Sequence, residues 1–205
     1  QTIVGLDLAL APSGGAVANV AEGAELRPGA WLTTPIMYRP ERLLMVRDAV
    51  RTLLNGLARP VLVSVESEAF GMGFRQDLDP AAIQAVVQVL LWEQRDTLRF
   101  LSVNPSRLKK YIGAKGKDEV LLQVYKRYGR EFRDHNIADA YVLAMIGLDV
   151  LHYERRGDLW PEVTKPQQEV LDALLVEGFL WERLPESRGA QKRAGKAARA
   201  ATMKS

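Results

Sequence analysis

The first strand-like segment, Thr2–Leu8, constrains the fold of this chain more than any other feature. Ile3, Val4 and Leu6 form a nearly continuous apolar run, which predicts a strand buried on both faces of a sheet. Asp7 stands at the end of this run. A carboxylate there must be paired, hydrogen-bonded or bound to a metal, because an isolated charge in apolar surroundings is costly. The alternative is that Asp7 only opens the turn toward residues 11–15.

Composition limits the kind of chemistry that is open to Asp7. The 205 residues fit one domain of ordinary size with an extension, and 47% hydrophobic residues suffice for a core. The absence of cysteine excludes disulfides, thiolate metal sites and cysteine nucleophiles, and the two histidines exclude a His-rich site. Oxygen ligands therefore remain for a metal.

Hydropathy gives no sign of a membrane. No apolar run approaches the ~18 residues of a membrane span. The apolar run that contains Asp7 lacks a basic segment before it and is unlike a secretion signal. We expect no membrane association and a cytoplasmic location, either in a bacterial cell or as a phage protein in the host cytoplasm.

The spacing of apolar and turn-forming residues predicts an α/β fold. Residues 15–20 and 25–34 complete a three-strand meander with the first strand, and three strand-helix units follow it. The further predicted elements are a helix over 40–57, a strand over 61–66, a helix over 80–93, a strand over 98–103, a short capped helix over 104–113, a helix from an Asp118 cap to Tyr128 that ends at Gly129, and a helix from Asp134 to about Tyr153.

Two more acids, like Asp7, stand next to apolar segments and need a partner for their charge. Glu66 ends the second buried strand. Asp139 lies among small residues inside the helix that Asp134 is expected to cap, and Asn136 lies one turn earlier on the same face. Small neighbours such as Ala140 would let this helix end approach the sheet closely. The alternative for Asp139 is a solvent-facing carboxylate favoured by the helix dipole.

Taken together, the three acids predict a metal site. Two buried strands that each end in a carboxylate, followed by a helix that presents a third, are typical of oxygen-ligated Mg²⁺. Two such ions about 4 Å apart clamp an in-line attack on a phosphodiester. We therefore predict that Asp7, Glu66 and Asp139 are metal ligands.

A glycine-rich loop and a lysine cluster are candidates for nucleic-acid contacts. Phe70, Phe74 and Arg75 would suit a finger that stacks on a base and meets a phosphate; alternatively, both rings fold back on the core. Glycines at 113 and 116 would let the backbone near the lysines approach a phosphate closely. The alternative for the lysines is an ordinary solvated surface. The clustered residues are Lys109, Lys110, Lys115 and Lys117.

These residues carry a resemblance to a known family. The segments Val4–Asp7, Val63–Glu66, Pro105–Lys117 and Ala138–Ala140 resemble, in this order, the motifs of RuvC-type Holliday junction resolvases, within the ribonuclease-H-like and retroviral-integrase superfamily. The resemblance covers roughly residues 2–153.

The resemblance implies more than the residues alone. It implies a mixed five-stranded sheet, with three antiparallel strands and the fourth and fifth parallel to the first, and a homodimer that places two active sites on a four-way DNA junction. It implies two Mg²⁺ ions per site, Lys109 and Lys117 near the scissile phosphate, and Phe70 near a junction-probing aromatic. The family's fourth ligand is typically Asp or His, whereas Asn136 stands here. The Asn136 carbonyl or Asp134 would complete the site, with lower metal affinity or a preference for Mn²⁺.

The C-terminal part is predicted to be an extension of this nuclease domain. We place the domain at residues 1–155 and a helical extension with a basic arm at 156–205. A helix over 167–180 has an apolar face that packs on the core, on a second copy or within a DNA-binding appendage; the sequence leaves these open. After Glu186 the chain has basic but no acidic residues, which suits a polyanion.

The leading hypothesis is a metal-dependent endonuclease that resolves branched DNA, the catalytic set being Asp7, Glu66, Asp139 and Lys117. One alternative is a nuclease of the same fold that acts on other branched DNA or structured RNA. A second, of another class, is an ATPase related to actin and sugar kinases, although the glycine-and-hydroxyl phosphate loop is missing after Asp7. A third is a non-catalytic junction-binding protein.

Overall fold

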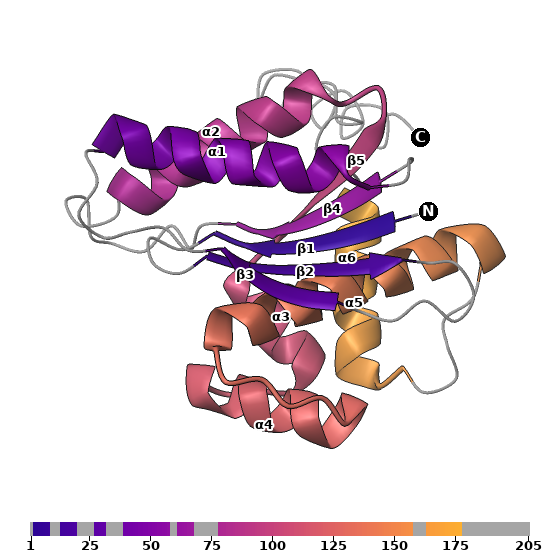
Figure 1. Ribbon diagram of the computed structural model, residues 1–205. Coiled ribbons are helices and arrows are strands. Elements are labelled where there is room, and N and C mark those ends of the chain that lie inside the picture. The colour runs from indigo at the N-terminus through magenta and orange to yellow at the C-terminus, as the bar shows by residue number, and fades with distance from the viewer. Residues whose placement is uncertain are drawn as a thin grey trace, which may run out of the picture.

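Strands and helices follow one another along the chain in the order that the apolar spacing predicts. The computed structural model describes residues 2–8, 13–19, 27–31, 39–57, 61–67, 78–157 and 163–177 (Figure 1). Their elements are β1 (Thr2–Asp7), β2 (Ser13–Asn19), β3 (Arg27–Trp31), α1 (Arg39–Asn55), β4 (Val61–Glu66), α2 (Leu78–Glu93), β5 (Leu98–Val103), α3 (Pro105–Ile112), α4 (Lys117–Tyr128), α5 (His135–Arg156) and α6 (Lys165–Glu177).

The strands form one sheet in the order β3-β2-β1-β4-β5. β1, β4 and β5 run parallel, while β2 is antiparallel to both β1 and β3. The predicted α/β fold is confirmed, and the parallel part of its sheet consists of three strands. Because β1 and β4 are parallel neighbours, their carboxyl ends meet at one edge of the sheet.

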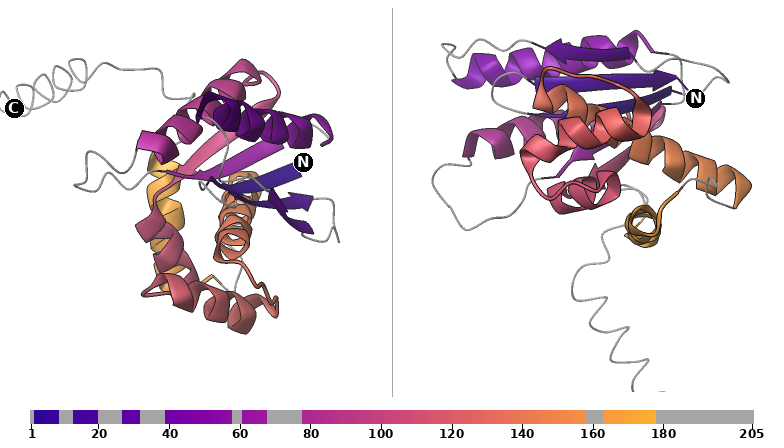
Figure 2. Two further views of the ribbon diagram at one scale, coloured as in Figure 1. Left: turned by 60° about the vertical axis from the view of Figure 1, so that its left-hand side comes forward. Right: turned by 90° about the horizontal axis from the view of Figure 1, so that it is seen from below.

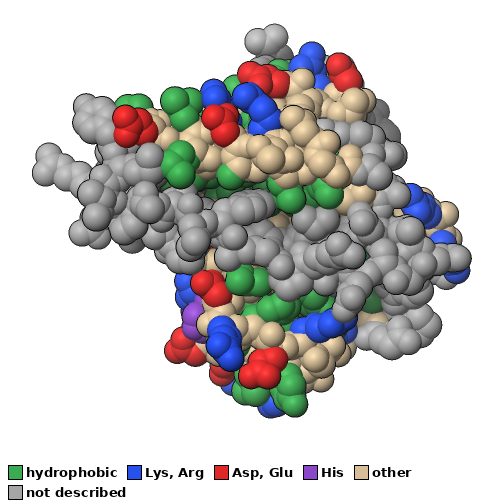
Figure 3. All heavy atoms as spheres, viewed as in Figure 1, with side chains coloured by type: hydrophobic (Ala, Val, Ile, Leu, Met, Phe, Trp, Pro, Cys, Tyr) green, Lys and Arg blue, Asp and Glu red, His purple; other side chains and the backbone are tan. Residues whose placement is uncertain are grey.

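Helices cover both faces of the sheet. α1 and α2 pack on each other over one face, and α5 crosses the other face against β1, β2 and β4 (Figures 1 and 2). α3, α4 and α6 surround α5 on its outer side. Acidic and basic side chains are interspersed over the outer surface of the helical layer drawn uppermost in Figure 3, as expected for a solvated face.

Strand alternation decides which side chains lie under α5. Val4 and Leu6 belong to the core beneath α1 and α2, whereas Ile3 and Leu62 belong to the core beneath α5. Successive side chains of a strand point to opposite faces. Asp7 and the last residue of β4 are therefore in phase with Ile3 and Leu62, on the α5 side.

Glycine lets α5 lie unusually close to the centre of the sheet. A Cβ atom added to Gly5 would stand 1.9 Å from the carbonyl oxygen of Ala140 and 2.6 Å from the nitrogen of Ala144. Farther along α5, a Cβ on Gly147 would stand 2.6 Å from the Oγ of Ser64. The approach predicted from the small residues near Asp139 is confirmed.

The helix ends confirm most of the predicted caps. The Asn104 side chain accepts a hydrogen bond from the nitrogen of Ser106 at 2.8 Å, and Gly113 ends α3 at a φ of 80°. Gly129 likewise ends α4, at a φ of 64°. The predicted Asp118 cap is wrong. The cap lies two residues earlier, at Gly116, whose backbone is extended, so Asp118 is an exposed residue of the first turn.

α6 packs on the rest of the domain. It lies against α3 and α5 and buries Val170, Leu171 and Leu174 in the same core as α5. Of the three options that the sequence left open for this helix, packing on the core is the one observed. The basic arm and residues 178–205 lie outside the described part. Among the described helices, none is both long and apolar enough to cross a bilayer.

We predict that Gly5→Ala destabilises the protein severely, because the new methyl group would collide with the main chain of α5 rather than with a movable side chain. The free energy of unfolding, measured by urea denaturation, should fall by about 3 kcal/mol or more. Gly56→Ala is the matched control, because its Cβ would meet only backbone oxygens at 3.5 Å and 3.7 Å. Equal stability of the two variants would contradict the close approach.

Candidate active site

Three carboxylates from three elements meet at the carboxyl edge of the parallel strands. Asp7 ends β1 and is only 7% exposed, and Glu66 ends β4 and is partly buried. Asp139 is presented by the first turns of α5 and is 9% exposed. The charge of Asp139 acts on both Asp7 and Glu66, and the charge of Glu66 acts on Asp7, so the fold places the three predicted acids within electrostatic reach of one another.

Burial and mutual repulsion make it costly to ionise these acids together. Burial, the charges of Glu66 and Asp139, and a hydrogen bond with Glu66 raise the pKa of Asp7 to about 8. Burial and the charge of Asp139 also raise the pKa of Glu66. The raised pKa therefore favours the protonated form of Asp7 at neutral pH, with a hydrogen bond between Asp7 and Glu66.

Two lysines supply compensating positive charge. Burial raises the pKa of Asp139, and Lys117 and Lys109 are among the charges that oppose this. The same two lysines lower the pKa of Glu66. Lys117 is the first residue of α4, and Lys109 lies in the last turn of α3. Each of these two helices therefore contributes one lysine near the acids.

The other two lysines of the predicted cluster lie differently. Lys110 is turned toward α6, where its Nζ lies 2.6 Å from the Oε2 of Glu169. Lys115 is exposed, and its main-chain nitrogen donates to Glu119 at 2.7 Å. Neither residue is among the charges that act on Asp7, Glu66 or Asp139.

The donor chemistry of this edge fits a hard divalent cation. The Oδ1 atom of Asp139 is buried without a hydrogen-bond partner, which is unfavourable unless a cation or water satisfies it. All three acids offer oxygen donors, as Mg²⁺ prefers. Among the described residues, however, no three acidic or histidine side chains already form a ligand set. Asp7 and Glu66 are in contact through their hydrogen bond, and Asp139 stands within electrostatic reach of both.

The two candidates for a further ligand are close together at the start of α5. Asp134 is the N-cap, as predicted, and its Oδ1 accepts a hydrogen bond from the nitrogen of Asn136 at 2.7 Å. This bond engages one oxygen of Asp134 in holding the helix end. Asn136 is partly buried in the first turn, one turn before Asp139.

The structure adds two residues that the sequence reasoning missed. His135 begins α5 and opposes the raised pKa of Asp139, and its Nδ1 is buried without a hydrogen-bond partner. Its position one helical turn before Asp139 is the signal that would have identified it. Gln84 of α2 donates from Nε2 to the main-chain oxygen of Glu66 at 2.9 Å. No sequence pattern marks that contact, because it joins a side chain to a distant backbone.

The predicted finger residues Phe70, Phe74 and Arg75 lie outside the described part of the chain. Their proposed contacts with bases and phosphate stay predictions.

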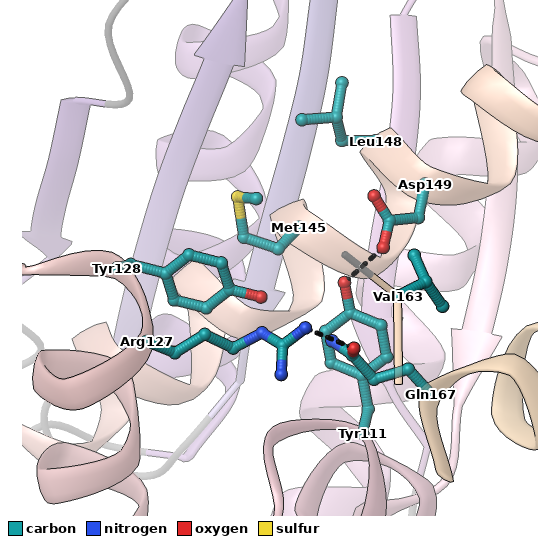
Figure 4. Close-up of a pocket in the computed structure, with 8 residues that line it drawn as sticks. All are labelled: Tyr111, Arg127, Tyr128, Met145, Leu148, Asp149, Val163 and Gln167. Atoms are coloured by element: carbon teal, nitrogen blue, oxygen red, sulfur yellow. Dashed lines mark hydrogen bonds between the residues drawn. The ribbon is translucent and has the colours of Figure 1, made fainter. Parts of the chain in front are cut away.

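A pocket of about 440 Å³ lies apart from the acids, between α3, α4, α5 and α6 (Figure 4). The hydroxyl of Tyr111 donates to Asp149 at 2.6 Å, and Arg127 donates to Gln167. Hydrogen bonds between its polar side chains link α3 to α5 and α4 to α6. We therefore interpret this pocket as part of the packing between the four helices. The lining residues are Tyr111, Arg127, Tyr128, Met145, Leu148, Asp149, Val163 and Gln167.

The sheet order, with α5 crossing β1 on one face and α1 and α2 over the other, can be compared with solved structures. Among solved structures, T. thermophilus RuvC in complex with Holliday junction substrate matches with a TM-score of 0.60 and 22% identity, over 77% of this chain and 96% of that chain. A second Thermus thermophilus RuvC structure matches with a TM-score of 0.58 and 21% identity, over 78% and 98%. No family model and no curated protein matches the sequence. The predicted resemblance to RuvC is thus confirmed at the level of the fold.

We predict that Asp7→Asn stabilises the metal-free protein. The folded-state pKa of Asp7 lies above its ordinary value of 3.8, so its ionisation costs stability increasingly as the pH rises from about 4 to about 8. The melting temperature in EDTA should therefore be higher for Asp7→Asn than for wild type at pH 8, and the difference should shrink toward pH 4. Asp172→Asn, at an exposed position of α6, is the control and should change little. A lower melting temperature for Asp7→Asn at pH 8 would contradict the burial of a repelled carboxylate.

Proposed function

We propose that this protein is a metal-dependent endonuclease that cleaves phosphodiester bonds of four-way DNA junctions. The observation that carries the proposal is the convergence of Asp7, Glu66 and Asp139, with Lys109 and Lys117, at one edge of the sheet. Such a group has the charges that a divalent cation and a phosphate require. The shared fold with RuvC, one of whose structures is a complex with Holliday junction substrate, supports the choice of substrate.

Each residue has a stated role in this proposal. Asp7, Glu66 and Asp139 hold two Mg²⁺ ions, or Mn²⁺, and the Asn136 carbonyl or Asp134 completes the set. When bound, the ions supply an activated water and neutralise charge on the phosphate during in-line hydrolysis. Asp7 loses its proton on binding, because cations replace the repulsion that raises the pKa of Asp7.

The lysines act on the substrate rather than on the metal. Lys117 of α4 and Lys109 of α3 lie near the acids. They are therefore placed to contact a DNA phosphate that binds beside the three carboxylates. Phe70, Phe74, Arg75, Lys115 and the basic arm are proposed to contact DNA farther from the scissile bond. A homodimer would present two such edges to one junction.

A cleavage assay tests the proposal directly. Labelled four-way junctions and linear duplexes are incubated with protein in Mg²⁺, Mn²⁺ or EDTA. We expect paired nicks in the junction that EDTA abolishes. Asp7→Asn, Glu66→Gln and Asp139→Asn should each lower the rate by at least about 100-fold, the scale at which even outer-shell partners of a metal act. Asp172→Asn is the matched control and should retain full activity.

The outcomes separate the alternatives. Junction binding without nicks in any metal would reject the enzyme and indicate a non-catalytic junction-binding protein. Cleavage of flaps, forks or structured RNA in preference to four-way junctions would keep the chemistry and change the substrate.

Asn136→Asp tests the completeness of the metal site. An added carboxylate one turn before Asp139 should strengthen cation binding, so the Mg²⁺ concentration that gives half-maximal cleavage should fall several-fold. Asn55→Asp, at an exposed position on α1, changes the net charge equally and should leave this concentration unchanged. An unchanged Mg²⁺ dependence of Asn136→Asp would exclude Asn136 from the ligand set.

A further inference from the structure

The basic residues of α3 face in two directions. Lys109 faces the acids of the candidate active site. Arg107 and Lys110 instead face α6: Arg107 donates from Nη1 to Glu177 Oε2 at 2.7 Å and bonds its other carboxylate oxygen as well, while Lys110 Nζ meets Glu169 Oε2 at 2.6 Å. α6 therefore places one carboxylate against each of the α3 cations on its side.

These ion pairs are not what holds α6 in place. Val170, Leu171 and Leu174 are buried, and Gln167 is 1% exposed. The Oε1 of Gln167 accepts from the nitrogen of Thr164 at 2.9 Å and also from Arg127, which joins the start of α6 to α4 (Figure 4). The half-exposed pair of Lys110 with Glu169 adds little to stability, and the bidentate pair of Arg107 with Glu177 adds to an attachment that the buried residues already provide. Their carboxylates call for another explanation.

That explanation is electrostatic. α3 follows directly on β5, at the sheet edge where the acids gather, so it borders the surface on which DNA is proposed to bind. A phosphate gains little from a cation that already has a carboxylate beside it, and the carboxylate itself repels the phosphate. Lys110 lowers the pKa of Glu169, and Glu177 raises the pKa of Arg107, so the pairs stay charged at neutral pH.

We propose that Glu169 and Glu177 are specificity-determining residues, which neutralise the α6 side of α3 and confine its DNA contacts to Lys109. Without them, Arg107 and Lys110 would add phosphate contacts that any duplex satisfies, and binding would depend less on the branched shape of the substrate. The inference rests on the proposed function and adds to it a role for α6 in distinguishing branched from linear DNA.

The double variant Glu169→Gln/Glu177→Gln tests the proposal in salt-dependent binding to linear duplex and four-way junction DNA. Two released cations should steepen the slope of log affinity against log salt on duplex by between about 1 and 2, at about 0.9 per phosphate neutralised. At low salt the duplex affinity should rise on the order of 10-fold, and the ratio of junction to duplex affinity should fall.

A matched control has the same net-charge change elsewhere. Glu93→Gln/Glu154→Gln removes the carboxylates that pair with Arg51 of α1 and Arg99 of β5, at the opposite end of the sheet from the acids. This control should leave the salt slope and the affinity ratio near wild type. Should the double variant melt earlier than wild type, Glu169→Gln alone, at a half-exposed side chain, should still steepen the slope by about 1.

Identical slopes for the wild type and the Glu169→Gln/Glu177→Gln variant would overturn the proposal. Equal effects of the two double variants would also overturn it, since they would show a response to net charge alone. A wild type without junction preference or cleavage would reject the proposed function instead. The difference in duplex slope between the two double variants would then still decide whether α6 masks the cations of α3.

Discussion

The close contact of α5 with the middle of the sheet is the constraint on which the site depends. Gly5 lies where the main chain of α5 at Ala140 presses on β1, and any side chain there would push the helix away. Asp139 precedes Ala140, so the same contact brings the third acid to the end of β1. A helix set farther out would separate Asp139 from Asp7, and the charge of Asp139, which raises the pKa of Asp7, would act on it more weakly.

This contact also explains why ionising the three acids costs stability. Packing that is tight enough to gather Asp7 and Asp139 also removes water from them, and burial is the largest cause of every raised pKa at this edge. Lys109 and Lys117 offset part of the cost. The remaining cost, together with the unsatisfied Oδ1 of Asp139, would favour a cation in the proposed metal site. Sites that trade stability for function in this way are common among enzymes.

Local patterns in the sequence predicted the acids because each lies in a regular element. Alternation along β1 and β4 fixes their faces, and the cap at Asp134 sets the phase of α5, so the convergence of Asp7, Glu66 and Asp139 could be inferred from period and order alone. The family resemblance singled out Lys109, but local patterns alone could not separate Lys109 from Lys110. Adjacent residues on a helix point about 100° apart, and which one meets the acids depends on a partner, Glu169, that lies about sixty positions away in the chain.

The same limit explains why Gln84 and the role of α6 were missed, whereas His135 did carry a local signal, one helical turn before Asp139. Gln84 and Glu169 act through contacts between distant segments, whereas a capping or alternation signal is confined to a few neighbouring positions. A cluster of lysines read from the sequence therefore overstates the surface open to a polyanion, because the fold assigns some of its members to carboxylates. If the protein prefers branched DNA, as proposed, carboxylates that neutralise such cations would support this preference, because an unpaired cation adds affinity for branched and linear DNA alike.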